Sequence, residues 1–160
     1  MTKYHLHKVE GEITDSKAIE AILLEGKYAT LAMCRDQEPY VVTLNYGYDG
    51  ESRTLFFHSA TEGLKLEFVR ANPLVCGTVI VDEGYVHGKC THAYRSVVFW
   101  GQMEILEDAA AKRTGLERMI EHLEADAATV RKRLLSDPAR LGNVEVLKLV
   151  IAEITGKGGQ

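Results

Sequence analysis

The sequence has few of the residues that mark specialised classes of protein. Its 160 residues include 3 cysteines, 3 prolines and 1 tryptophan. An odd number of cysteines with no Cys-X-X-Cys pair is not the framework of a disulfide-rich secreted domain, so we expect reduced thiols. Little proline and no internal repeat exclude collagen-like and proline-rich chains.

Long apolar runs and an excess of positive charge are also missing. Uninterrupted apolar stretches such as Val97 to Trp100 are too short to cross a bilayer, and residues 1–10 lack the apolar segment of a secretory signal. The formal net charge is −4, which favours neither nucleic acid nor an anionic membrane as a partner. We therefore expect a cytoplasmic protein with no membrane or nucleic-acid partner.

The composition that remains is that of an ordinary globular chain. It is 46% hydrophobic and 26% charged, and a domain of this length buries roughly 70% of its unfolded surface without a disulfide or a metal. We expect a single domain over residues 1–160, with a loose glycine-rich tail at about 156–160.

Helix and strand signals alternate along the chain. Hydrophobic periodicity and caps predict helices at residues 15–26, 62–72, 108–124 and 126–135. Alternation and turn residues predict strands at 28–34, 40–48, 54–58, 74–82, 94–106 and 144–154, the fifth of them central and broken or bulged at Gly101. This order predicts an α+β fold built on a six-stranded, mostly antiparallel split or closed β-barrel with flanking helices.

The segment from His58 to Lys65 has the pattern of an anion-binding site. A strand ends in hydroxyl residues, and a helix then begins with a lysine in its first turn. Free amides at a helix N-terminus attract phosphate, Ser59 can donate to its oxygens, and Lys65 supplies the compensating charge. The alternatives are a lysine neutralised by Glu62 or a solvated lysine on an ordinary capped helix.

Two further segments are weaker candidates. Thr43 and Asn45 share one strand face and could bind the polar edge of a flat heterocycle, although solvent-facing residues give the same alternation. Arg95, between Tyr94 and Ser96, could contact a phosphate or an aromatic ring, or form a surface ion pair.

A histidine-rich stretch contains His87, Cys90 and His92, which are residue types that bind zinc or haem iron. A fourth ligand is not evident unless His5 or His7 folds back, so we predict no native metal site. The sequence also lacks the GxSxG, HExxH, P-loop and GxGxxG motifs of the common hydrolases, metalloproteases and nucleotide-binding proteins.

Six segments in chain order resemble the nitroimidazole-reductase branch of the pyridoxamine-5'-phosphate-oxidase-like flavoproteins. The resemblance spans about residues 12–157. The segments are Tyr40 to Tyr46, Phe57 to Ala60, Gly63 to Glu67, Ala71 to Cys76, Tyr94 to Val98 and Ile154 to Lys157.

The resemblance implies an FMN-binding split barrel that forms a homodimer, with two flavins at the subunit interface. Carried over by position, the isoalloxazine ring would be lined by Val42, Thr43, Leu44 and Asn45. His58 and Ser59 would contact flavin and phosphate, and Lys65 would pair with the phosphate. The flavin would also be approached, from the partner subunit, by Tyr94, Arg95 and Ser96.

The activity implied is electron transfer from a reduced nicotinamide, through FMN, to a small nitroaromatic or related acceptor. His58 would be the catalytic residue if it transfers a proton, or it would only orient the flavin. A non-catalytic flavin-binding or redox-sensing module and a haem-handling split barrel are the alternatives. Residues 153–160 contain no arginine, which disfavours pyridoxamine-phosphate oxidation, and Thr43 stands where the family usually has proline.

Overall fold

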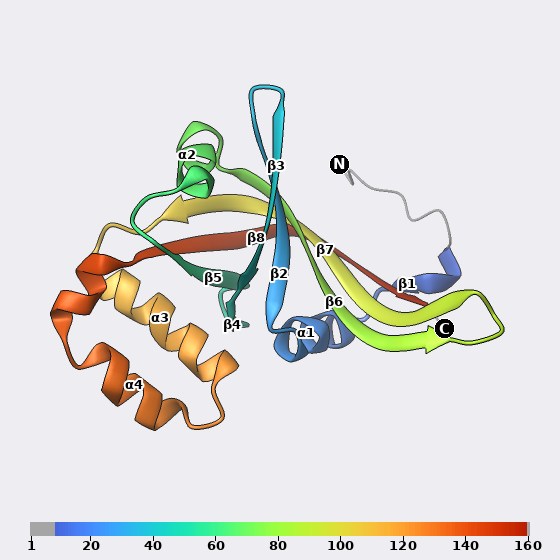
Figure 1. The fold of residues 1–160 in the computed structure, drawn as a ribbon. Coiled ribbons are helices and arrows are strands. Elements are labelled where there is room, and N and C mark those ends of the chain that lie inside the picture. Colours follow the sequence, from blue (N-terminus) through green and yellow to red (C-terminus); the bar gives the residue numbers. More distant parts are fainter. Residues whose placement is uncertain (1–8, 160) are drawn as a thin grey trace.

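A computed structural model describes residues 9–159, and it contains one antiparallel sheet with helices packed around it (Figure 1). The helices are α1 (Ser16–Glu25), α2 (Leu64–Ala71), α3 (Ala109–Leu123) and α4 (Ala127–Leu135), with short 3-10 helices η1 (Val9–Gly11) and η2 (Pro138–Asn143). The strands are β1 (Glu12–Ile13), β2 (Tyr28–Arg35), β3 (Glu38–Asn45), β4 (Gly47–Asp49), β5 (Thr54–Ser59), β6 (Leu74–Val86), β7 (Thr91–Ile105) and β8 (Glu145–Gly159).

The strands follow the order β3-β2-β6-β7-β8-β5-β4, and β1 pairs with β8. Every pairing is antiparallel, and the two ends of the sheet do not join, so the barrel is split. The predicted α+β class with flanking helices is therefore confirmed. The described residues contain eight strands rather than six, because the two-residue β1 was not predicted and the strand predicted at 40–48 is interrupted at Tyr46.

Local signals account for where the helices begin. The carboxylate of Asp15 accepts hydrogen bonds from the amides of Lys17 and Ala18, and Asp108 and Asp126 cap α3 and α4 in the same way. These caps satisfy amide donors that have no partner inside the helix. The predicted starts of three helices are thus correct to within one or two residues.

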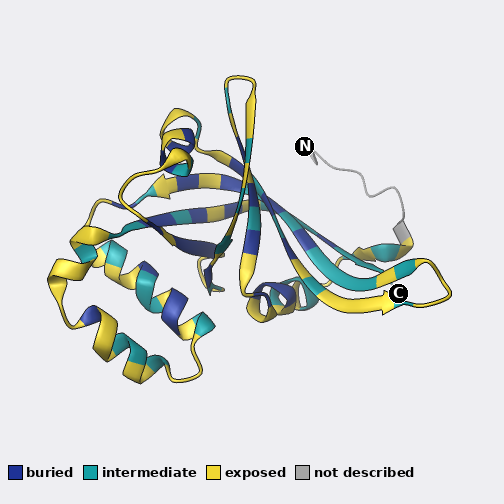
Figure 2. Cartoon of the chain, viewed as in Figure 1, coloured by how far each residue is buried: buried dark blue, intermediate teal, exposed yellow. Residues whose placement is uncertain are grey.

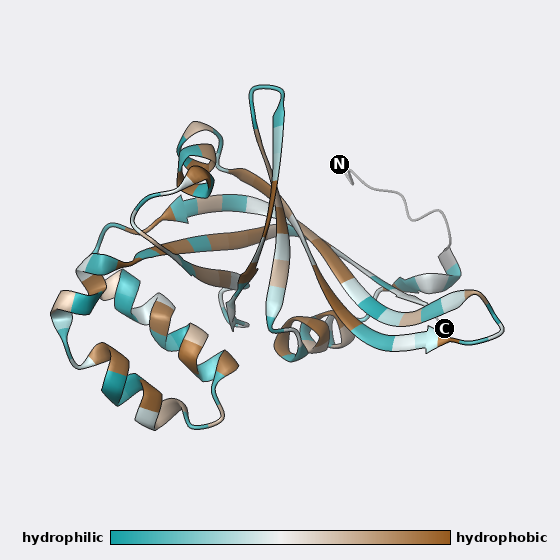
Figure 3. Ribbon diagram, in the orientation of Figure 1, coloured by the Kyte–Doolittle hydropathy of each residue, from teal (hydrophilic) through white to brown (hydrophobic). Residues whose placement is uncertain are grey.

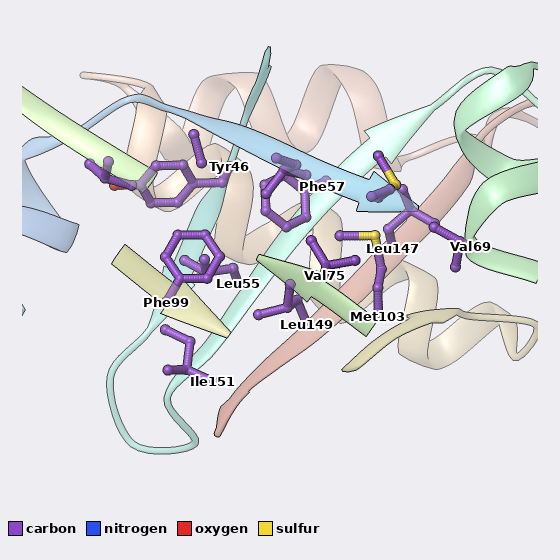
Figure 4. Packing of buried hydrophobic residues seen from close by; sticks show 14 of the residues in the cluster. Tyr46, Leu55, Phe57, Val69, Val75, Phe99, Met103, Leu147, Leu149 and Ile151 are labelled. Atoms are coloured by element: carbon purple, nitrogen blue, oxygen red, sulfur yellow. The ribbon is translucent and has the colours of Figure 1, made fainter. Parts of the chain in front are cut away.

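One face of the sheet carries the main core. Fully buried side chains from five strands meet there, among them Leu55, Phe57, Phe99 and Leu149, together with Tyr46 between β3 and β4 (Figure 4). In β2 the buried residues recur at every second position, which is the period of a strand with one buried face (Figure 2). In β5 four consecutive residues are buried, because both of its faces are covered. Burial of such side chains stabilises the fold by about 1.5–3 kcal/mol each.

Helix α3 lies close against β4 and β5 because two glycines leave room for it. A Cβ atom added at Gly47 would lie 2.4 Å from the backbone nitrogen of Met119, and one added at Gly115 would lie 2.8 Å from Cγ1 of Val146. Phe56, Val146 and Met119 form a second core cluster at this contact. The opposite face of β5 is therefore covered by helix, whereas β2 and β3 have no helix over their outer face (Figure 1).

The long strands contain two irregularities. Trp100 pairs with Glu153 and Gly101 with Ile151, so Ala152 is an extra residue in β8 opposite the position where a bulge was predicted. A second shift lies between Asp82 and Gly84 in β6. Strand β7 is central, between β6 and β8, as predicted.

The expectation of a loose tail is wrong for residues 156–159. They form the end of β8, with Gly156 opposite Val97 and Gly159 opposite Tyr94. Glycine is suited to this position because a Cβ at Gly156 would lie 2.9 Å from the carbonyl oxygen of Ile13. In the part of the chain that the structure describes, no helix combines the length and the apolar character needed to span a membrane.

Candidate functional site

Ser59 and Lys65 meet at the point where β5 ends and α2 begins. The ammonium of Lys65 donates a hydrogen bond of 2.9 Å to the hydroxyl of Ser59, which is 5% exposed. Among the described residues, Lys65 forms no ion pair with Glu62 or with any other carboxylate. A half-buried ammonium with only a neutral partner favours a bound anion.

The N-terminus of α2 adds unpaired donors to the same place. Gly63 caps the helix with φ of 140°, a backbone conformation that favours glycine, and no side chain caps it. The amides of the first turn therefore keep no side-chain acceptor, in contrast to α1, α3 and α4. A Cβ at Gly63 would meet nothing within 4 Å, so this end of the helix is approachable. Its amides, Lys65 and Ser59 suit a phosphate group.

His58 precedes Ser59 and points to the opposite side of β5. It is exposed at the edge of an apolar cavity beside α3 and α4, and within residues 9–159 it has no hydrogen-bond partner. Because neighbouring strand residues face opposite sides of a sheet, one short segment presents a hydroxyl to the anion site and an imidazole to the cavity.

Strand β3 connects the regions around α2 and β5. The ring of Tyr40 lies 5.0 Å from Phe68 on α2, and the ring of Tyr46 lies 6.4 Å from Phe57 on β5. Between them, Val42 and Leu44 pack partly buried against the core.

The polar residues of β3 face the other side. The hydroxyls of Thr43 and Thr30 lie 3.0 Å apart, and the amide nitrogen of Asn45 donates to the carbonyl of Lys27 at 3.0 Å. The four predicted ring-lining residues are therefore divided between two faces of the strand. Only the backbone of these four residues belongs to both faces of the strand.

The segment from Tyr94 to Ser96 is not brought to this site within one chain. Ile105 on β7 and Phe57 on β5 both lie opposite Leu147, and the segment lies further along β7, about 30 Å away at about 3.3 Å per residue. Arg95 is paired instead with Glu83 at 2.6 Å and with Glu25 at 3.0 Å. Ser96 donates to the carbonyl of Lys157 at 3.4 Å.

The histidine-rich hairpin does not form a metal site in the described residues. His92 binds the carboxylate of Asp82 at 2.6 Å, which lowers the pKa of Asp82, and the ring of His87 contacts Tyr85 edge-on at 5.3 Å. No group of three or more potential ligands occurs within residues 9–159, and His5 and His7 lie outside them. Cys90 is a free, exposed thiol.

Comparison with known proteins assigns the chain to a family. The sequence profile of the pyridoxamine 5'-phosphate oxidase family matches residues 15–158. The chain therefore belongs to the pyridoxamine 5'-phosphate oxidase family. A curated relative, an uncharacterised protein of Rhizobium meliloti, is 34% identical over 56 residues, and this match spans 35% of each chain.

Solved structures place the chain more finely within this oxidase family. A proposed 5-nitroimidazole antibiotic resistance protein from Bacteroides thetaiotaomicron is 29% identical, covers 97% of this chain and 96% of its own, and has a TM-score of 0.77. This similarity supports the nitroimidazole-reductase-like branch.

Two more distant structures share the fold. They are the flavocytochrome Anf3 of Azotobacter vinelandii, at 18% identity and TM-score 0.79, and an FAD- and haem-binding protein of Mycobacterium smegmatis, at 19% and 0.73. The alignments cover 98% and 94% of this chain, and 73% and 74% of theirs.

A polar junction between the end of α1 and α3 was not predicted from the sequence. His122 binds the carbonyl of Gly26 at 2.6 Å, and Lys27 donates to the carbonyl of His122 at 2.8 Å. Beside them the Tyr46 hydroxyl donates to the carbonyl of Leu23 at 2.6 Å. Burial lowers the pKa of His122, with a smaller contribution from Lys27, and the bond to Gly26 opposes this. Partners so far apart in sequence leave no local pattern.

Proposed function

We propose that this protein is an FMN-dependent reductase that passes electrons from a reduced nicotinamide to a small nitroaromatic or related acceptor. The observation that carries the proposal is the pairing of the Lys65 ammonium with the Ser59 hydroxyl, without a carboxylate, at an uncapped helix N-terminus. Membership of the pyridoxamine 5'-phosphate oxidase family and the similarity to the Bacteroides protein support the same proposal.

The residues present fit the phosphate of a flavin mononucleotide. Lys65 would pair with it, and Ser59 and the first-turn amides of α2 would donate hydrogen bonds to its oxygens. The backbone of residues 42–45, which runs between α2 and β5, would lie along the isoalloxazine ring. When bound, FMN supplies the transfer of electrons between donor and acceptor.

His58 is the side chain proposed to act in catalysis. It is exposed, has no competing hydrogen bond within the described residues and adjoins Ser59. An imidazole there would hold a proton or deliver it to the acceptor, because imidazole is the side chain that most often serves as a general acid or base. If it only orients the flavin, substitution with asparagine would preserve the rate and its pH profile.

We also propose that the working form is a homodimer. Tyr28, Val41, Leu74 and Ile80 lie on one face of β2, β3 and β6 by register, and each is more than half exposed. Exposed apolar side chains on one face of a sheet are typical of an interaction surface. A second copy on this face would bring the partner segment from Tyr94 to Ser96 toward the flavin, which one chain cannot do.

The test begins with the visible absorption spectrum of the purified protein and the mass of any molecule released by heat. We expect a yellow protein that releases FMN, and NADH or NADPH oxidation that depends on an added nitroaromatic. Release of FAD would show that the bound flavin is FAD and not FMN. A colourless protein that takes up neither flavin would refute the proposal, and bound FMN without turnover would leave a flavin-binding module instead.

A further inference from the structure

The cavity beside His58 has no role in binding the phosphate. It has a volume of about 340 Å³ and lies between α3, α4 and η2. Figure 3 shows apolar bands on both helices. The walls are mainly apolar, from Leu116, Ile120, Leu123, Val130, Leu141 and Val144.

A space of this size is not a usual packing gap. Protein interiors are close-packed, and voids larger than a water molecule are few. At about 30 Å³ for each water-sized group, 340 Å³ holds about eleven non-hydrogen atoms. Leu134 at the same cavity is 38% exposed, so a small molecule can reach the space from solvent.

The charged residues at the rim of the cavity do not favour an ionic ligand. One cation, Arg140, and one anion, Glu124, line the cavity, so it has no net charge to offer an ionic ligand. Burying an ion against the apolar walls would also cost its hydration.

The rim does offer hydrogen-bond donors. The guanidinium of Arg140 forms no ion pair within the described residues, and its one hydrogen bond is a 3.4 Å contact with the carbonyl of Arg133. The guanidinium has five N–H donors and no acceptor. It therefore has donors to spare for an acceptor atom on a ligand.

We propose that this cavity binds an uncharged, mainly apolar molecule of about eleven non-hydrogen atoms that carries a carbonyl-like acceptor. The apolar body lies among the leucines, and the acceptor oxygen faces Arg140 and His58. Because His58 and Ser59 face opposite sides of β5, the occupant lies on the other side of this strand from the anion site. Its binding does not depend on the proposed function.

The test is calorimetric titration with three probes that share a 4-ethylphenyl group: a methyl ketone, a carboxylate and an aminomethyl cation. We expect the wild-type protein to bind 4-ethylacetophenone at least tenfold more tightly than either ion. Leu134→Glu should weaken binding of the ketone roughly tenfold or more, because it places a charge at the apolar mouth. The control is Leu24→Glu on α1, which changes another exposed leucine away from the cavity and should leave ketone binding unchanged.

Arg140→Gln keeps the test valid if Leu134→Glu fails to fold. It should weaken ketone binding about fivefold, the effect of one lost hydrogen bond, without changing the apolar walls. No binding of the ketone by a folded, flavin-loaded protein would overturn the cavity proposal alone. A protein that binds the ketone but binds no flavin would overturn the proposed function and leave the cavity proposal standing.

Discussion

Lys65 and Arg95 are both cations that the family resemblance predicts in the cofactor site, yet their surroundings differ. Lys65 has one hydroxyl partner and no carboxylate among the described residues, whereas Arg95 has two carboxylates, from α1 and from the bulge in β6. A charged side chain that already has a counter-ion within the protein gains little binding free energy from a charged ligand. A half-buried charge without a counter-ion gains much. From this contrast we propose that Lys65 binds the phosphate and that Arg95 holds β6 and β7 against α1.

The largest effect is expected for Lys65→Ala. FMN affinity should fall roughly 10- to 100-fold, which corresponds to about 1.5–3 kcal/mol for a charge-assisted bond. Fluorescence titration of the flavin measures it, with Lys132→Ala on α4 as the matched control. Equal affinities for the two variants would remove Lys65 from the site.

A charge on the exposed face of β2, β3 and β6 tests whether a second copy of the chain completes the cofactor site. Ile80→Asp should weaken self-association about tenfold or more, because the carboxylate would be buried without a partner, and FMN affinity should fall with it. Sedimentation velocity measures association. Val150→Asp is the control, since Val150 is also an exposed strand residue but lies on β8, outside this patch. A wild-type protein that stays monomeric at all concentrations would contradict the dimer.

Arg95→Met addresses the paired cation directly. We expect the free energy of unfolding to fall by about 1 kcal/mol, since two partly exposed ion pairs are lost, each of small value. FMN affinity should change less than in Lys65→Ala. If it falls as far, Arg95 contacts the cofactor and the contrast between the two cations fails.

His122 gives the smallest expected effect and is a third case, a basic group whose pKa is lowered by burial. Its pKa is lowered in the folded protein, so the unfolded chain binds the proton more tightly. The stability it contributes is present above the ordinary histidine pKa of about 6.5 and is lost as the pH falls below that value. Urea unfolding of wild type and His122→Gln across this range should show a smaller decrease at low pH in the variant. Parallel curves would contradict the prediction.

Local sequence signals were enough to predict most elements and one part of the site. Asp15, Asp108 and Asp126 cap helices through residues two or three positions away, and Ser59 and Lys65 are separated by six positions. Patterns of this range are visible in a sequence.

Pairings between distant segments were not predictable in this way. Arg95 and Glu25 are 70 residues apart, and Lys27 and His122 are 95 apart. Their meeting depends on the tertiary packing of α1, α3 and the sheet. For the same reason the glycine-rich end of β8 was expected to be loose, since its partners β1 and β7 are specified elsewhere in the chain.

Ala152 determines which changes in chain length β8 can accept. Inward-facing residues are Leu147, Leu149 and Ile151 before it, and Ile154 and Gly156 after it, so the extra residue resets the alternation. Substitution of Ala152, which is exposed, leaves this count unchanged. Loss of its single codon would remove the bulge and leave every other pairing of β8 with β7 in register. Loss of a paired residue such as Leu149 would instead turn the residues between it and the bulge to the wrong face. Length variation within β8 among related genes should therefore fall at Ala152 and otherwise be concentrated in the turns.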